Sequence, residues 1–310
     1  MAVDLAIQGM RRSGTTFLFD VLSADDRFDT YYEPLAPARR KAVGGGSRIR
    51  DVDFFDKIRQ VRAEFGRGRP GLDLARLNQG APRSCAAEFA SEFEPDVADY
   101  VSFLFERADW SLLKFVRASA KLPALLRLRP DLKVVHIVRD PRAVVTSYLF
   151  GKGRKHADRY RDPAAFFGHD GSSEGPMQLQ ALMLADQLIA DGLLALRSDA
   201  PTVLKLLGLW KWHFRVTHGD GIRVLGANRY LLVRHEEILA RPESSIESIF
   251  ALIGEEVPGP VRHWLHQHLD PEPRIFEPFD CRWRDAIGAL AMEDELTEAG
   301  YEGILEANVT

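Results

Sequence analysis

Residues 3–22 read VDLAIQGMRRSGTTFLFDVL, and the prediction of the fold rests mainly on their pattern. The apolar run at 3–7 predicts a strand, and the apolar side chains after the turn recur at helical spacing, which predicts a helix over 15–22. Between them, Gly9 and Gly14 have the Gly-x-x-x-x-Gly spacing of a phosphate loop. Glycines let successive backbone N–H groups face one anion, and the helix that follows adds the positive end of its dipole. The stretch therefore predicts a strand–loop–helix unit that binds phosphate.

The rest of the chain continues this alternation of strands and helices. Further strands are predicted at 111–116, 133–138 and 230–233, and further helices at 142–149 and 242–253. The strand at 133–138 is β-branched and apolar on both faces, as expected of a buried parallel strand. The pattern predicts an α/β fold in one domain over 1–310, a three-layer P-loop-like arrangement with a central parallel sheet flanked by helices.

Composition narrows the classes of partner. The chain has 310 residues, 45% of them hydrophobic, and a formal net charge of −4, so it can bury a sizeable core and lacks the basic balance of a nucleic-acid binder. We see no apolar stretch long enough to span a bilayer and no signal peptide, so we expect a cytoplasmic protein with no membrane partner. Basic residues crowd 11–69 and 139–161, which suits an anionic ligand, although solvated basic surfaces have the same composition.

The phosphate loop lacks a feature of nucleoside-triphosphatase loops. The lysine of those loops should follow Gly14, and Thr15 stands there instead. The cation precedes the second glycine, as Arg12 with Arg11 beside it. No Asp at a neighbouring strand end is a convincing Mg²⁺ ligand of the kind that γ-phosphoryl transfer needs. The loop is therefore expected to bind phosphate without transferring a γ-phosphoryl group, and an ordinary strand–helix turn is the alternative for the spacing alone.

The segment 12–17, RSGTTF, resembles the 5′-phosphosulfate loop of sulfotransferases that use 3′-phosphoadenosine 5′-phosphosulfate (PAPS). The segment begins with an arginine, as in the carbohydrate and tyrosyl-protein types of the family, whereas the cytosolic aryl type has a lysine at this position. The chain therefore resembles the first two types more closely than the third. The resemblance implies that the cosubstrate PAPS is bound by the residues of this loop, namely Arg11, Arg12, Ser13, Gly14, Thr15, Thr16 and Phe17.

Three later segments carry the same resemblance. Residues 136–147, HIVRDPRAVVTS, resemble the family's 3′-phosphate segment, which implies that Arg139 and Ser147 bind the 3′-phosphate. An arginine at the carboxyl end of a parallel strand lies where α/β folds bind ligands, and just over two helical turns separate it from the serine. In 230–239 a histidine, His235, replaces the tyrosine that often lies near the adenine in the family. More weakly, Arg282 and Trp283 resemble an element that closes over the nucleotide.

Sulfuryl transfer needs a base for the acceptor hydroxyl and cations for the charge that develops on the leaving phosphate. We expect Arg12 to be the main cation, assisted by Lys114, for which an exposed lysine at a strand end is the alternative. The position at which cytosolic members have a catalytic histidine holds Val116, which takes no proton. The segment 31–35, YYEPL, resembles the Glu-Pro element of the carbohydrate and tyrosyl types, which implies that Glu33 is the base.

The surroundings of the expected base also lead to a pKa prediction. Phe28, Tyr31 and Tyr32 would partly desolvate Glu33, which would raise its pKa towards a value useful for proton transfer. A glutamate that caps a helix or forms a salt bridge is the alternative for this position.

The function predicted from the sequence is thus sulfuryl transfer from PAPS to a hydroxyl of a carbohydrate or another small molecule. A P-loop small-molecule kinase and a catalytically silent nucleotide-binding protein are the alternatives. The basic loops at 39–50 and 152–161 could contact an anionic acceptor or only the donor. No metal site is predicted, because His263, His266 and His268 have no cysteine nearby and only Asp270 as a close carboxylate. The oligomeric state cannot be predicted.

Overall fold

A computed structural model of the chain describes residues 2–37, 54–80, 84–150, 166–168, 176–269 and 281–306. The basic loops predicted at 39–50 and 152–161 lie outside the described residues. The described part forms a five-stranded, wholly parallel sheet of order β2-β3-β1-β4-β5. The strands are β1 (Val3–Gln8), β2 (Asp29–Tyr32), β3 (Trp110–Phe115), β4 (Lys133–Val138) and β5 (Tyr230–Arg234). The predicted α/β fold with a central parallel sheet is confirmed.

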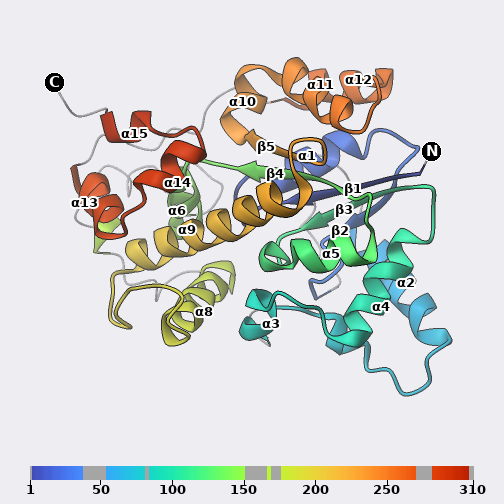
Figure 1. Cartoon of the computed structure of the whole chain (residues 1–310), viewed down its shortest axis with the longest axis horizontal. Helices are drawn as coiled ribbons and strands as arrows, with labels where there is room; N and C mark the ends of the chain where they lie inside the picture. The colour runs from blue at the N-terminus through green and yellow to red at the C-terminus, as the bar shows by residue number, and fades with distance from the viewer. Residues whose placement is uncertain are drawn as a thin grey trace.

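Helices cover both faces of the sheet, which Figure 1 shows nearly edge-on. Above it lie α1 (Thr15–Leu22), α10 (His235–Ala240), α11 (Pro242–Leu252) and α12 (Gly259–His268). Below it lie α2 (Phe54–Arg67), α4 (Pro95–Phe105) and α5 (Leu122–Leu128). Alternate residues of β1 explain the layering, because Leu5 and Ile7 pack with α1 and α11 while Ala6 packs with α4 and α5.

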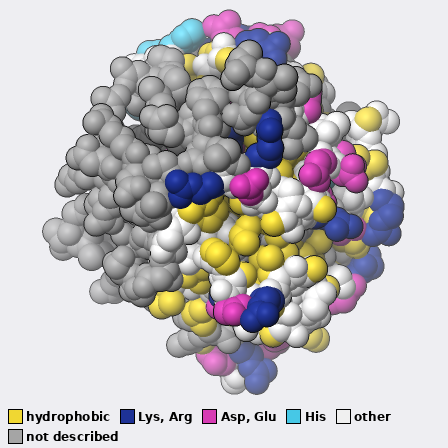
Figure 2. Space-filling model, turned by 90° about the vertical axis from the view of Figure 1, so that its left-hand side faces the viewer, with side chains coloured by type: hydrophobic (Ala, Val, Ile, Leu, Met, Phe, Trp, Pro, Cys, Tyr) yellow, Lys and Arg dark blue, Asp and Glu magenta, His cyan; other side chains and the backbone are white. Residues whose placement is uncertain are grey.

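A third group of helices extends the molecule beyond β4 and β5. It contains α6 (Pro141–Phe150), α8 (Pro176–Ala190), α9 (Thr202–Asp220), α13 (Cys281–Ala289), α14 (Glu293–Glu298) and α15 (Gly303–Glu306). The short helix α3 (Cys85–Phe89) packs against α8. These helices share one apolar cluster, and Leu179 of α8 and Leu193 just after it are exposed. Figure 2 shows the side of the molecule that faces left in Figure 1, with hydrophobic side chains gathered near the centre of the described surface.

The predicted elements agree closely with the observed ones. The helix at 15–22 and the strand at 133–138 have the predicted bounds, and the other predicted strands and helices differ by at most one residue at either end. The strand β2 was not predicted, and it is short and lies at the edge of the sheet. Among the described helices, none has the length and hydrophobicity needed to cross a membrane.

Candidate functional site

The phosphate loop connects β1 to α1 and owes its shape to two close approaches. Gly14 has φ of 91°, and a Cβ atom at this position would lie 2.1 Å from the ring of His235. A Cβ atom on Gly9 would lie 2.5 Å from the carbonyl oxygen of Ile137 in β4. Only glycine fits both positions without displacing a neighbour, because it alone has no side chain and tolerates positive φ. The Gly-x-x-x-x-Gly spacing therefore forms a tight loop against β4 and α10.

Arg12 joins this loop to the predicted 3′-phosphate segment. Its Nε donates to the Ser147 hydroxyl at 2.8 Å, and its Nη2 donates to the Ser147 carbonyl oxygen at 3.2 Å. In the reverse direction, Arg139 donates from Nη1 to the carbonyl oxygen of Arg12 at 3.2 Å. Arg12 has φ of 78°, a left-handed conformation that is costly for a residue with a side chain and is often found at functional sites. Three residues that are predicted to bind PAPS thus form one cluster, although Arg12 precedes Arg139 and Ser147 by more than 120 residues.

Lys114 and Glu33 form a buried ion pair beside the loop. The Lys114 ammonium lies 2.6 Å from Glu33 Oε1, and the two side chains are 1% and 17% exposed. Lys114 also donates to the Thr16 hydroxyl at 3.3 Å and lies 4.0 Å from the centre of the Tyr32 ring. The alternative of an exposed lysine is therefore wrong. The candidate base, the amine and the first turn of α1 are in direct contact.

The unpredicted strand β2 explains how Glu33 reaches this position. Tyr32 pairs with Lys114 across β2 and β3, and the next amide, Glu33 N, donates to the Lys114 carbonyl oxygen at 3.0 Å. Glu33 then leaves the sheet with φ of 44°, again in the left-handed region. A short edge strand thus places the carboxylate at the carboxyl edge of the sheet, where ligands of α/β folds bind.

The pKa of Glu33 is shifted from its ordinary value in the direction opposite to the one predicted from the sequence. Burial raises this pKa, but the charge and hydrogen bond of Lys114, together with the charges of Arg11 and Arg117, lower it by more. The net effect is a pKa below the ordinary value, so the predicted rise is wrong. Burial lowers the pKa of Lys114, and the charges of Glu33 and Tyr32 with their hydrogen bonds raise it by more. Glu33 is therefore an ionised carboxylate at neutral pH, paired with the Lys114 ammonium.

A second buried charge cluster supports the loop from the side of α3. Arg11 donates from Nη1 to Glu88 Oε1 at 3.2 Å, and Arg117 lies 3.3 Å from Glu88 Oε2. Glu88 is 1% exposed, and Arg117 also donates to the carbonyl oxygen of Gln79 at 2.8 Å. Burial and the charge of Arg11 lower the pKa of Arg117 to about 10. Arg11, which is predicted to bind PAPS, thus pairs with the carboxylate of Glu88, a residue that the sequence alone did not indicate.

The other predicted ligands lie in ordinary packing contacts. Ser13 and Thr15 are buried in the loop and the first turn of α1, and Phe17 packs against Trp264 of α12 with ring centres 5.9 Å apart. Trp283 packs edge-on against Phe166 and Phe167. The Arg282 guanidinium lies 5.6 Å from the centre of the Phe167 ring. Nucleotide contacts by Arg282 and Trp283 stay predictions.

The histidines of α12 take part in local contacts. His268 donates from Nδ1 to the Trp264 carbonyl oxygen at 3.0 Å, and His266 lies 3.3 Å from a Glu243 oxygen. Within the described ranges, no group of three or more histidine, cysteine or acidic side chains is placed to bind a metal ion.

Comparisons with known proteins bear on what this site does. The family model described as "Sulfotransferase family" matches residues 4–190. No curated protein matches the chain. Solved structures with a similar arrangement include sulfotransferase STF9 from Mycobacterium avium, with 15% identity, a TM-score of 0.47, and coverage of 96% of this chain and 76% of that one. Another is the sulfotransferase domain of the Synechococcus PCC 7002 olefin synthase, with 17% identity, a TM-score of 0.45 and 94% coverage of each chain.

Proposed function

Because the chain belongs to the sulfotransferase family, we propose that it transfers a sulfuryl group from PAPS to a hydroxyl of a carbohydrate or another small molecule. One observation carries the proposal. Arg12, Arg139 and Ser147 are joined by hydrogen bonds at the carboxyl edge of the sheet, and the Glu33–Lys114 pair contacts the same loop through Thr16. The two arginines have the charge needed to bind the phosphates of a sulfuryl donor, and the Glu33 carboxylate can take up the proton of an acceptor hydroxyl.

The donor is proposed to lie across the loop and the start of α6. Backbone amides of the phosphate loop and the Arg12 guanidinium bind the 5′-phosphosulfate, since a planar guanidinium matches oxyanion geometry. Arg139 and Ser147 bind the 3′-phosphate. Arg12 bonds to Ser147, and donor binding is proposed to exchange that contact for phosphate oxygens.

Transfer is proposed to proceed in line. Glu33 accepts the proton of the acceptor hydroxyl, whose oxygen forms a bond to the donor sulfur. The bond from that sulfur to the bridging oxygen breaks, and its electron pair stays on the 5′-phosphate of the departing 3′,5′-adenosine bisphosphate. Arg12 and Lys114 stabilise this charge, and no step requires a metal ion. The Glu-Pro arrangement at Glu33 favours a chemistry like that of the carbohydrate and tyrosyl-protein types.

The first prediction tests donor class by thermal unfolding. We expect 3′,5′-adenosine bisphosphate without Mg²⁺ to raise the melting temperature, because a ligand at 100 times its Kd stabilises the folded state by about 2.7 kcal/mol. Stabilisation by ATP with Mg²⁺ and none by the bisphosphate would instead favour the kinase alternative. Binding of the bisphosphate with no transfer from PAPS to a panel of hydroxyl acceptors would favour the silent nucleotide-binding protein.

The second prediction concerns the proposed 3′-phosphate ligand. Arg139→Ala should weaken bisphosphate binding by about 2 to 3 kcal/mol, which is roughly 30- to 150-fold, because a charged hydrogen-bond donor is lost. Isothermal titration with AMP, which lacks the 3′-phosphate, should give an unchanged Kd. Arg197→Ala is the matched control, since Arg197 is exposed and pairs with Asp199. An equal loss for both nucleotides would refute the 3′-phosphate assignment.

A further inference from the structure

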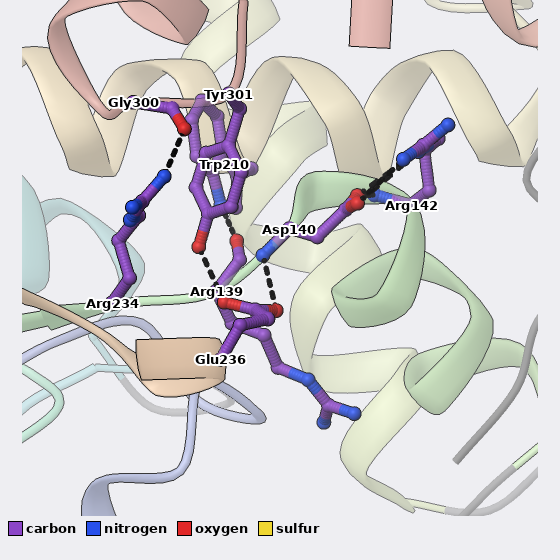
Figure 3. Close-up of polar contacts among 8 residues, drawn as sticks. All are labelled: Arg139, Asp140, Arg142, Trp210, Arg234, Glu236, Gly300 and Tyr301. Atoms are coloured by element: carbon purple, nitrogen blue, oxygen red, sulfur yellow. Dashed lines mark hydrogen bonds and ion pairs between the residues drawn. The ribbon is translucent and has the colours of Figure 1, made fainter. Parts of the chain in front are cut away.

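The peptide group between Arg139 and Asp140 is held at both of its polar atoms (Figure 3). Its carbonyl oxygen, on Arg139, accepts a hydrogen bond from Trp210 Nε1 at 3.0 Å. Its N–H, on Asp140, donates to Glu236 Oε1 at 3.1 Å. Trp210 comes from α9 and Glu236 from α10, so two elements on opposite sides hold one peptide plane. The carboxyl end of β4 is thereby fixed in orientation.

The second oxygen of Glu236 is held by a residue near the C-terminal end of the described chain. The Tyr301 hydroxyl donates to Glu236 Oε2 at 2.7 Å, and Tyr301 is 8% exposed. The Glu236 carboxylate therefore bridges the Tyr301 hydroxyl and the Asp140 amide, with one oxygen for each. Neither oxygen has to be shared, which keeps the carboxylate in a single orientation between the two donors.

Local structure around Tyr301 shows that this contact is anchored. Gly300 ends α14 with φ of 75°, and Tyr301 N donates back to the Leu296 carbonyl oxygen at 2.7 Å. The Gly300 carbonyl oxygen accepts a hydrogen bond from Arg234, whose guanidinium also pairs with Glu237 at 2.6 Å. The turn after α14 is thus attached to the end of β5 and the start of α10, the same segment that carries Glu236 (Figure 3).

The orientation of this peptide plane fixes the Arg139 side chain relative to the helix that follows. The plane sets ψ of Arg139, which is the torsion that relates this side chain at the end of β4 to the direction of α6. The same plane begins α6, because Asp140 caps the helix by accepting from Arg142 N at 2.8 Å. Ser147 lies on that helix. Holding the plane therefore orients both proposed ligands of the 3′-phosphate.

We propose that Tyr301 and Glu236 are positioning residues that orient Arg139 for the 3′-phosphate of the donor; this inference rests on the proposed function. Tyr301 acts through Glu236, and Glu236 acts through the Asp140 amide. Both residues lie beyond 4–190, the part that the family model matches. The C-terminal third of the chain thus contributes to the donor site without touching the donor.

The test is the affinity of Tyr301→Phe for two nucleotides, measured by isothermal titration. This variant keeps the ring and removes only the hydroxyl, so we expect the Kd of 3′,5′-adenosine bisphosphate to rise about five- to tenfold, the range of a modest coupling between sites. The Kd of AMP should not change, because AMP has no 3′-phosphate. Glu236→Gln, which keeps the shape but weakens both hydrogen bonds, should give a loss of at least the same size.

A double-mutant cycle separates positioning from general support of the fold. In an Arg139→Ala background, Tyr301→Phe should cost less bisphosphate affinity than it does alone, because one of the two 3′-phosphate ligands that it orients is gone. Tyr230→Phe is the matched control: it removes another buried tyrosine hydroxyl, one bonded to His136 and His218, and should lower the melting temperature without changing the ratio of the two Kd values.

The outcomes distinguish the inference from the proposed function. If the wild-type protein does not bind the bisphosphate, the proposed function fails, and the positioning role fails with it. If the wild type binds and Arg139→Ala weakens binding while Tyr301→Phe does not, only the positioning role is overturned. Equal losses for both nucleotides, or the same loss in the Arg139→Ala background, would also overturn it.

Discussion

The Glu33→Gln variant is expected to bind 3′,5′-adenosine bisphosphate like the wild-type protein and to lose about 10²- to 10⁴-fold of kcat, the usual contribution of a general base. The amide has nearly the same shape as the carboxylate but accepts no proton. Arg12, Arg139 and Ser147, the proposed ligands of the donor phosphates, are unchanged by this substitution. The loss should therefore appear in kcat rather than in donor affinity.

Turnover with PAPS and any acceptor found in a hydroxyl screen measures this effect. Glu64→Gln is a suitable control, because Glu64 is exposed and pairs with Arg107. If the Glu33→Gln enzyme kept more than a tenth of the wild-type kcat, another residue would have to be the general base.

The pH profile gives a second reading of the same prediction. Since the pKa of Glu33 is held below its ordinary value, the carboxylate is already ionised well below neutral pH. Titration of Glu33 should then leave kcat unchanged between pH 8 and pH 6, and should lower kcat only at more acidic pH. An acidic limb with a midpoint between 6 and 7 would assign proton transfer to another group.

The Glu88→Gln variant is expected to lose about 3 to 5 kcal/mol of unfolding free energy, as when one partner of a buried ion pair is removed. Glu88 lies between Arg11 and Arg117, and all three side chains are less than a tenth exposed. A neutral amide leaves two guanidinium groups buried without their shared counter-ion. Their mutual repulsion already contributes to the lowered pKa of Arg117.

Urea unfolding of the two proteins measures this difference. Glu92→Gln is the matched control, because Glu92 pairs with Arg127 on the surface, where such a pair contributes about 0 to 1 kcal/mol. A loss of less than 1 kcal/mol for Glu88→Gln would show that the two arginines need no counter-ion in the folded protein.

Much of the fold could be predicted because the hydrophobic pattern of each strand and helix agrees with its position in the folded protein. Strands β1 and β4 are apolar on both faces, and the sheet buries both faces, so their apolar runs needed no tertiary information. The glycines of the phosphate loop could be predicted for a similar reason, since their spacing reflects two close backbone approaches. The strand β2 could not, because a short edge strand is stabilised by its neighbour β3 rather than by its own residues.

The site was predictable only where a motif marks it. Arg12, Arg139 and Ser147 lie in recognisable segments, but their mutual hydrogen bonds join positions far apart in the chain. Glu88 lies in a helix of five residues with no motif, and its role depends on two arginines that approach it from other elements. The pKa of Glu33 was predicted in the wrong direction, because aromatic neighbours are visible in sequence and an ion pair with a lysine 81 residues away is not.

The strand order has a consequence for synthesis of the chain. The central strand β1 is made first, yet both of its neighbours, β3 and β4, end more than 100 residues later. At about 5 to 20 residues per second, the ribosome needs roughly 7 to 28 s to reach the end of β4. Until the end of β4 is made, the apolar strand β1 lacks at least one of its two neighbouring strands. The nascent chain is therefore expected to need protection from aggregation before the proposed donor site can form.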